Sequence, residues 1–225
     1  MTKFKSILGS VITATLLATS VTASAIPLSI SITGTGDFAG IAYSGSTSST
    51  ALSSGFQYAS NGTSFSMDTS YLSPYSSPIP FLSSSFFADN TLGTSTGTIT
   101  IMATAQGYTG LTALSPNTVS SHFGGFNTGA DSTAQAWIDN ANVLFSMPAI
   151  YTTGVQGPFS SASYSDDQST SFISANPFSI TQRIVLNVAA GGNVSGGFTT
   201  KVPEPGTLAL VGLGLLAAGA LRRKK

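Results

Sequence analysis

The chain has 225 residues, a formal net charge of zero and only 7% charged residues. Between residues 26 and 201 the cations are Arg183 and Lys201, against seven aspartates. Two cations cannot form a basic groove for a phosphate backbone, so the composition excludes nucleic-acid binding. The chain has no cysteine and one histidine, His122, which excludes disulfides and a zinc site.

The amino-terminal segment has the three parts of a secretory signal peptide. Lys3 and Lys5 form a basic region, and residues 7–21 are mostly apolar. Ala23-Ser24-Ala25 fits a small-x-small cleavage site, with cleavage after Ala25. We therefore predict a signal peptide over residues 1–25, export by the Sec translocation machinery, and a mature chain that begins at Ile26.

Residues 26–201 alternate between apolar and polar side chains with a period of two, which is typical of half-buried strands. The alternation is clear at residues 28–33, 64–68 and 97–104, and longest at residues 178–188, where Arg183 should point outward. A turn at Gly191-Gly192-Asn193 predicts a hairpin with a return strand over residues 194–200. Further strands are expected at residues 55–59, 119–126, 133–138 and 143–147.

Many short strands joined by turns rich in Gly, Ser and Pro predict an all-β fold. We expect an antiparallel β-sandwich, jelly-roll-like, over residues 26–201, with no helix longer than two or three turns. The absence of a repeat of fixed length argues against a solenoid.

Few residues are available for catalysis. His122 should lie on the strand face opposite Phe123 and could act as a base with one of many Ser and Asp residues, but no Gly-x-Ser-x-Gly elbow accompanies it. The lone glutamate, Glu204, lies outside the predicted domain, so a hydrolytic pair would need two aspartates. We therefore expect no enzyme activity and no catalytic, cofactor-binding or metal-binding residue.

Three other patterns have a functional and a plain structural interpretation. Asp166-Asp167 could bind Ca²⁺ from a loop, although a solvated turn explains the pair better. Thr94, Thr96, Thr98 and Thr100 could form an ice-binding row, although an exposed strand face is the simpler interpretation. The glycines of residues 34–40 imitate a dinucleotide fingerprint with the wrong spacing, and no helix-forming segment follows them.

The carboxyl terminus has three distinct parts. Pro203-Glu204-Pro205 keeps the backbone extended, residues 207–221 are apolar, and Arg222, Arg223, Lys224 and Lys225 end the chain. The apolar stretch would span about 22 Å as a helix, less than the ~30 Å of a bilayer core, with the cations on the cytoplasmic side. A plain tail anchor or a buried terminal helix would show similar periodicity.

Residues 202–225 resemble the PEP-CTERM sorting signal of Gram-negative bacteria. The resemblance rests on Val202-Pro203-Glu204-Pro205-Gly206-Thr207-Leu208, the Gly- and Leu-rich stretch and the basic end. It implies recognition by an exosortase, which cuts near Pro203-Glu204-Pro205 after a transient stay in the inner membrane. Residues 176–201 are similar to the closing strands of β-sandwich domains in such proteins, which implies a very short tether at residues 199–202.

These observations predict an exported, non-catalytic protein of the cell surface or extracellular matrix. The resemblance implies an association with exopolysaccharide and biofilm. The alternative is a carbohydrate-binding, lectin-like module, for which aromatic side chains are available at Tyr71, Tyr75, Phe81, Tyr108, Trp137, Tyr151 and Tyr164, without clustering in the sequence. Ice binding and hydrolysis are remoter alternatives.

Overall fold

The structure, a computed structural model, describes residues 27–47, 53–60, 62–72, 80–109, 116–160, 162–174 and 177–202. These residues form ten strands and one short 3₁₀ turn, and all strand pairs are antiparallel. The all-β, antiparallel prediction is confirmed. Within this part of the chain no helix is long and apolar enough to cross a membrane.

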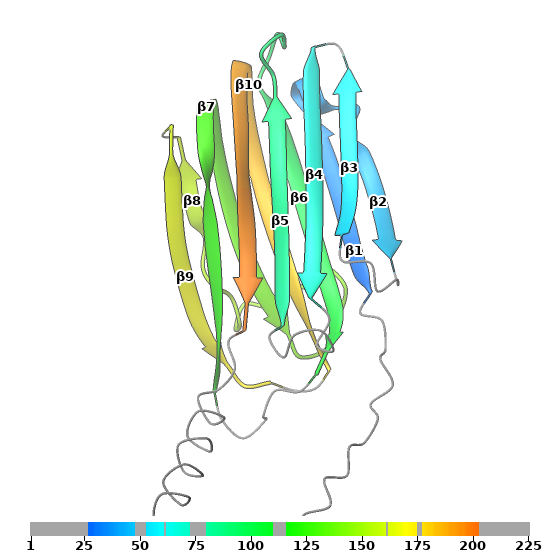
Figure 1. Cartoon of the computed structure of the whole chain (residues 1–225), viewed down its shortest axis with the longest axis vertical. Helices are drawn as coiled ribbons and strands as arrows, with labels where there is room; N and C mark the ends of the chain where they lie inside the picture. The colour runs from blue at the N-terminus through cyan, green and yellow to red at the C-terminus, as the bar shows by residue number, and fades with distance from the viewer. Residues whose placement is uncertain are drawn as a thin grey trace, which may run out of the picture.

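The strands follow the chain in the order shown in Figure 1. Their bounds are β1 (Leu28–Thr35), β2 (Ala42–Thr47), β3 (Ser53–Ser60), β4 (Thr63–Leu72), β5 (Phe81–Asp89), β6 (Gly97–Tyr108), β7 (Asn117–Asp139), β8 (Gln156–Phe159), β9 (Tyr164–Phe172) and β10 (Phe178–Lys201); the 3₁₀ turn η1 spans Gly36–Phe38.

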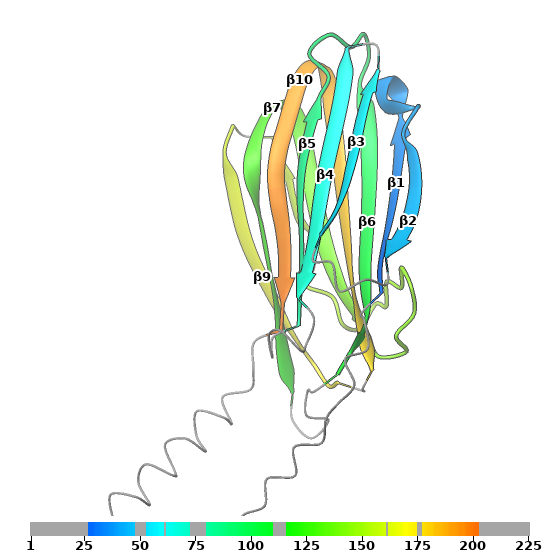
Figure 2. The same cartoon turned by 45° about the vertical axis from the view of Figure 1, so that its right-hand side comes forward.

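One continuous sheet folds over into two layers, because β7 and β10 each have two arms (Figures 1 and 2). Residues 178–188 of β10 pair with β6 and with residues 130–139 of β7, whereas residues 193–201 pair with β5 and with residues 120–128 of β7. The back layer therefore runs β2-β1-β6-β10-β7-β8 and the front layer β3-β4-β5-β10-β7-β9. The expected sandwich is thus a single folded sheet.

Glycines form the corner where the two long strands change layer. Gly129 in β7 and Gly191 in β10 have φ values of +59° and +80°, which favour glycine. A Cβ at Gly192 would lie 2.4 Å from the carbonyl oxygen of Gly129, so the two bends touch through their backbones. Asn90 fixes the corner, since its Nδ2 donates to the carbonyl of Val188 at 3.1 Å.

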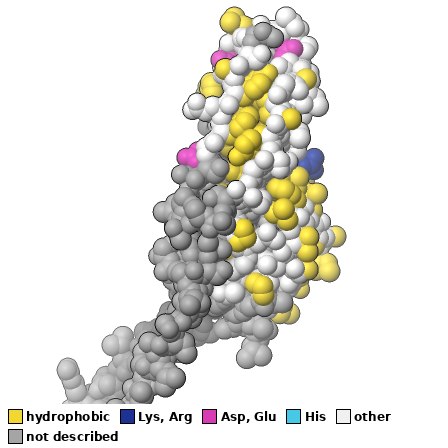
Figure 3. Space-filling model, turned by 90° about the vertical axis from the view of Figure 1, so that its right-hand side faces the viewer, with side chains coloured by type: hydrophobic (Ala, Val, Ile, Leu, Met, Phe, Trp, Pro, Cys, Tyr) yellow, Lys and Arg dark blue, Asp and Glu magenta, His cyan; other side chains and the backbone are white. Residues whose placement is uncertain are grey.

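The two layers enclose one apolar core. The inward positions of the first β10 arm, Phe178, Ile180, Ile184, Leu186 and Val188, are fully buried, and Arg183 is exposed, as the alternation predicts. An aromatic pair closes each open side. Tyr43 of β2 lies 4.8 Å from Phe56 of β3 between ring centroids, and Phe159 of β8 stacks on Tyr164 of β9 at 4.9 Å. Figure 3 shows hydrophobic side chains along the side where β2 and β3 meet.

A buried glutamine connects the layers inside this core. Gln182 lies between Ile180 and Ile184 on the inward face of the back layer and is 1% exposed. Its Nε2 donates to the carbonyl of Leu82 at 2.9 Å and to the Thr200 hydroxyl at 2.9 Å, and its Oε1 accepts from Ser84 at 3.0 Å. All three partners belong to the front layer, so this amide joins the two layers by hydrogen bonds.

Several local predictions are wrong. The return strand exists, but the arms of β10 lie in different layers and do not pair as a hairpin. Residues 143–147 form a loop, in which Phe145 has a positive φ of 53°. Residues 199–201 belong to β10 and Val202 is fully buried, so the tether cannot begin before Pro203.

The predicted signal peptide, including Ala23 and Ala25, lies outside the described residues, as do the membrane stretch 207–221 and the sorting residues Pro203, Glu204, Pro205, Arg222, Arg223, Lys224 and Lys225. The domain boundaries at residues 25 and 201 stay predictions. The first described strand begins at Leu28 and the last ends at Lys201, and both of these residues lie at the same end of the folded sheet.

Gln182→Leu should destabilise the domain by about 2–4 kcal/mol, because a leucine of similar size removes the buried hydrogen bonds to the Leu82 carbonyl and to the hydroxyls of Thr200 and Ser84. Denaturant unfolding followed by tryptophan fluorescence measures the loss, and Gln57→Leu, at an exposed position of β3, is the control. Equal stability of the two variants would show that the amide does not hold the layers together.

Candidate functional site

The outer face of the front layer is built from small and hydroxyl side chains. Alternation along β4 and β5 buries Phe65, Met67 and Phe86, and leaves Ser66, Asp68, Ser85 and Phe87 on the outer face. Antiparallel register then aligns these residues with outward residues of β10, β7 and β9. The outer face therefore consists of rows of side chains that run across the strands.

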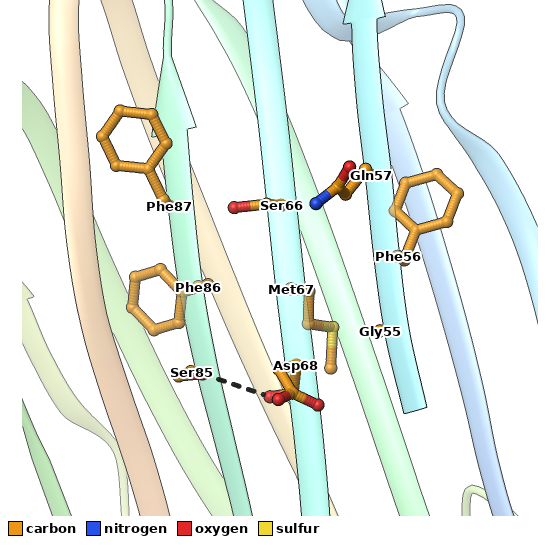
Figure 4. Close-up of a pocket in the computed structure, with 9 residues that line it drawn as sticks. All are labelled: Gly55, Phe56, Gln57, Ser66, Met67, Asp68, Ser85, Phe86 and Phe87. Atoms are coloured by element: carbon orange, nitrogen blue, oxygen red, sulfur yellow. Dashed lines mark hydrogen bonds between the residues drawn. The ribbon is translucent and has the colours of Figure 1, made fainter. Parts of the chain in front are cut away.

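One of these rows forms a trench, because its members are nearly all glycine or serine. By register it contains Gly55 of β3, Asp68 of β4, Ser85 of β5, Gly197 of β10, Gly124 of β7 and Ser165 of β9. Over β3 to β5 the surface is hollowed by roughly 770 Å³ (Figure 4). We call this row the trench.

Two exposed aromatic side chains border the trench. Phe87 of β5 is 40% exposed and Phe126 of β7 is 47% exposed, and both align with Ser195 of β10, which lies between them. Two strand spacings place the two backbones about 10 Å apart. Exposed rings beside polar groups suit contacts with the apolar faces of sugars.

The opposite border of the trench is polar. By register it contains Ser83, Thr199, His122 and Asp167, and the hydroxyls of Ser83 and Thr199 are hydrogen-bonded at 2.9 Å. Nδ1 of His122 lies 3.0 Å from Oδ1 of Asp167. The His122 ring leans over the trench floor, since a Cβ at Gly124 would lie 3.2 Å from its Nε2.

The trench glycines belong to two Gly-Gly pairs that face each other across β7 and β10. Gly125 and Gly196 face inward, where a Cβ at either would lie within 2.8 Å of the Tyr164 hydroxyl, so packing requires glycine at both. A Cβ at Gly197 would meet only the Ser84 carbonyl oxygen at 3.5 Å, an ordinary contact. Packing therefore does not explain the missing side chain at Gly197.

The charges around the trench select against anionic ligands. Asp68 and Asp167 are both exposed on this face, and Asp89 lies at its far end. Lys201 is the described cation of the front layer, in the last row of β10. An uncharged polymer meets no such repulsion.

The His122–Asp167 pair resembles the histidine–carboxylate part of a catalytic triad. The described residues offer no hydroxyl hydrogen-bonded to Nε2, and the side chains of the pair are 52% and 81% exposed. Asp166 and Asp167 lie in strand β9, which corrects the turn predicted for them. Because successive strand residues point to opposite faces, their carboxylates do not converge on one ion.

The aromatic residues singled out from the sequence do not form the exposed border. Tyr108, Trp137 and Tyr164 are buried, and Phe81 and Tyr151 are half-buried. Of Tyr71 and Tyr75 the structure describes no side chain. The sequence contained a usable signal all the same: in the doublet Phe86-Phe87, one ring of a strand must face outward.

The other sequence patterns have structural explanations. Thr94 and Thr96 precede β6, so only Thr98 and Thr100 of the proposed ice-binding row share that strand. The glycine-rich residues 34–40 contain the end of β1 and the turn η1, and they lead from β1 to β2 rather than to a helix.

A second hollow, at the end of the sheet away from Lys201, is organised by Asp37. Its carboxylate accepts from the Ser95 hydroxyl and from the backbone N–H groups of Ser95 and Thr94, each at 2.7 Å. These hydrogen bonds, foremost that of the Ser95 hydroxyl, lower the pKa of Asp37 below its ordinary value of 3.8. The carboxylate thereby fixes the loop between β5 and β6.

Asp37→Asn should lower the melting temperature at neutral pH, because an amide replaces one acceptor oxygen by a donor. A lowered folded-state pKa stabilises the protein above pH 3.8, and this contribution disappears as the pH falls through the lowered value. The difference in melting temperature between the native chain and Asp37→Asn should therefore shrink below pH 3.8. Melting curves across pH measure this difference, with Asp68→Asn as the control. A difference that does not depend on pH would contradict a stabilising role of the Asp37 carboxylate.

Comparison with known proteins identifies the end of the chain that follows this domain. Residues 201–224 match the PEP-CTERM protein-sorting motif, which implies an exported protein processed by an exosortase during a transient stay at the membrane. The chain thus carries a PEP-CTERM protein-sorting motif at residues 201–224, and the resemblance seen in the sequence is confirmed for this segment.

No protein of curated function matches the chain in sequence. Among solved structures, the bacteriophage CBA120 tailspike protein 4 enzymatically active domain gives a TM-score of 0.35 at 10% identity, over 77% of this chain and 19% of the tailspike chain. TmCBM61, solved with β-1,4-galactotriose, gives a TM-score of 0.32 at 9% identity, over 60% of this chain and 86% of that chain. TM-scores this low do not support any conclusion about what the trench binds.

Proposed function

We propose that this protein is exported, cut by an exosortase and placed at the cell surface or in the extracellular matrix, where its β-domain binds an uncharged polysaccharide without catalysis. The sorting motif at residues 201–224 supports the route. The trench, with Phe87 and Phe126 along one border, supports the binding role.

The observation that carries the binding role is the glycine at position 197. The inward glycines are needed to make room for Tyr164, whereas Gly197 has space for a side chain and lacks one. The absence of a side chain at residue 197 keeps the trench open from Ser85 to Gly124, between exposed rings on one side and hydroxyl groups on the other. This arrangement suits an extended polymer that lies across the strands, with stacking on one border and hydrogen bonds on the other.

The charge distribution narrows the ligand to polysaccharides of low charge. Exposed carboxylates of Asp68 and Asp167 lie in or beside the trench and would repel uronic acids or phosphates. An association with exopolysaccharide, implied by the sequence resemblance, is compatible with a neutral polymer of that kind.

Hydrolysis remains the competing proposal, and it depends on the His122–Asp167 pair. The exposure of both side chains, and the lack of a hydroxyl partner for Nε2 among the described residues, argue for a binding role, in which His122 contributes a hydrogen bond at the border of the trench. Release of reducing ends from a bound polysaccharide, abolished in His122→Ala, would instead support catalysis.

Gly197→Leu should abolish polysaccharide binding and leave the fold intact, because the new side chain fills the trench. Phe87→Ala and Phe126→Ala should each weaken binding by about tenfold, as for exposed aromatic contacts in other interfaces. The probe is exopolysaccharide from the bacterium that makes this protein, separated by anion exchange into neutral and acidic fractions.

Thr33→Leu adds the same side chain to an exposed position of β1 on the back layer and is the matched control. Only the neutral fraction should bind the native chain and the control. Unchanged binding by Gly197→Leu would remove the trench as the site.

Replacing Pro203, Glu204 and Pro205 with alanine should block release and leave membrane insertion intact, because the extended cleavage site is lost while the apolar stretch 207–221 remains. Cell fractionation should then find the full-length chain in the inner membrane. The Gly197→Leu variant, altered only in the domain, should be released normally. Intact-mass analysis measures whether released protein still contains residues 207–225. Their presence would contradict exosortase processing.

A further inference from the structure

The loop between β7 and β8 lies over the outer face of the back layer and is held there by hydrogen bonds. Asn142 anchors its start, since Oδ1 accepts from the N–H of Gly107 at 2.8 Å and its carbonyl oxygen accepts from Gln106 at 2.6 Å. The N–H of Phe145 donates to the Thr104 hydroxyl at 3.2 Å, and Ser179 donates to the carbonyl of Val143 at 3.2 Å. The start of the loop is therefore fixed to β6 and β10.

This fixed loop exposes large apolar side chains to solvent. Val143 is 51% exposed, Leu144 41%, Met147 48% and Ile150 78%. They account for four of the nine exposed large hydrophobic residues among those that the structure describes. Clustered exposure of this kind marks a contact surface. We call residues 143–150 the apolar loop, and Figure 3 shows hydrophobic side chains along the flank formed by the back layer.

The apolar loop lies at the end of the sheet from which the chain leaves for the membrane. Tyr108, Phe178 and Lys201 all lie at this end, where the Tyr108 hydroxyl donates to the carbonyl of Phe81 across the layers. Val202 is buried there, and four residues, 203–206, separate it from the apolar stretch 207–221. Four residues reach at most about 14 Å, so an anchored domain cannot move far from the bilayer.

The charges also favour the back layer as the side that meets lipid. Arg183 is exposed on this face, one row beyond the Thr104–Thr181 pair that lies against the loop. Of the aspartates on this face, Asp131 lies toward the opposite end and accepts from Asn187, and the buried Asp139 accepts from N–H groups of Ala141 and Val143. The exposed carboxylates of Asp68 and Asp167 lie on the front layer. Anionic phospholipid would therefore meet a cation and apolar side chains.

We propose that the apolar loop inserts into the outer leaflet of the inner membrane while the chain is anchored, so that the domain lies on its back layer. This inference rests on the anchoring step of the proposed function. Apolar side chains of this size reach the boundary between headgroups and acyl chains, about 5–10 Å deep. The trench, on the opposite layer, then faces away from the bilayer.

The absence of cysteine permits a direct test with single-cysteine variants of the full-length chain. Ile150→Cys, Ser169→Cys and Leu213→Cys would each be labelled with an environment-sensitive fluorophore and reconstituted in vesicles of phosphatidylethanolamine and phosphatidylglycerol. Ser169 is exposed on β9 in the same row as Lys201, so it reports the same end of the sheet on the front layer. Met147→Cys is a second position in the apolar loop.

Spin-labelled lipid should quench the labels at residues 150, 147 and 213 by about twofold or more and leave the label at residue 169 nearly unquenched, as expected for interfacial insertion. Quenching at residue 213 without quenching at 150 or 147 would overturn the inference and leave the anchor intact. If the label at residue 213 is not quenched, this result overturns the anchor and the inference together. A spectral shift at residue 150 that depends on protein concentration in lipid-free micelles would assign the loop to a second copy of the chain and overturn lipid contact.

Discussion

The fold depends on one constraint, the contact between the bends of β7 and β10. Each strand passes from one layer to the other, and the bends touch where Gly192 approaches the carbonyl of Gly129. Because the same two strands pair side by side in both layers, neither layer can slide against the other without breaking the pairing in both. Asn90 closes this corner from the loop after β5, and Gln182 adds hydrogen bonds between the layers deeper in the core.

This constraint also sets the register on which the candidate site depends. With the corner fixed, Gly124 falls opposite Gly197 and Gly125 opposite Gly196, so two adjacent glycine pairs face opposite sides of the sheet. The inward pair admits Tyr164, whose ring stacks on Phe159 and closes the open side between β8 and β9. The outward pair forms the trench floor. One local sequence feature therefore serves both the core and the surface.

Alternation predicted the strands in which one face is dry and the other wet, such as β6 and both arms of β10. It missed β9, because the inward residues Asp166, Gln168 and Thr170 of this edge strand are polar and half-exposed. It missed β5, where the inward Ser84 donates to Gln182 and interrupts the apolar pattern. The trench depends on residues from different strands that register alone brings together, so no single stretch of sequence could indicate it.

The two surfaces differ in a way that bears on release. The apolar loop contributes four side chains of modest size, and even a single myristoyl chain gives only marginal, reversible membrane binding. Such a loop can orient a domain that is already anchored, because the tether keeps its local concentration high. Once the anchor is cut, the same contact is too weak to retain the domain at the bilayer. An orienting contact of this strength is therefore compatible with export, whereas a longer apolar segment on the back layer would oppose it.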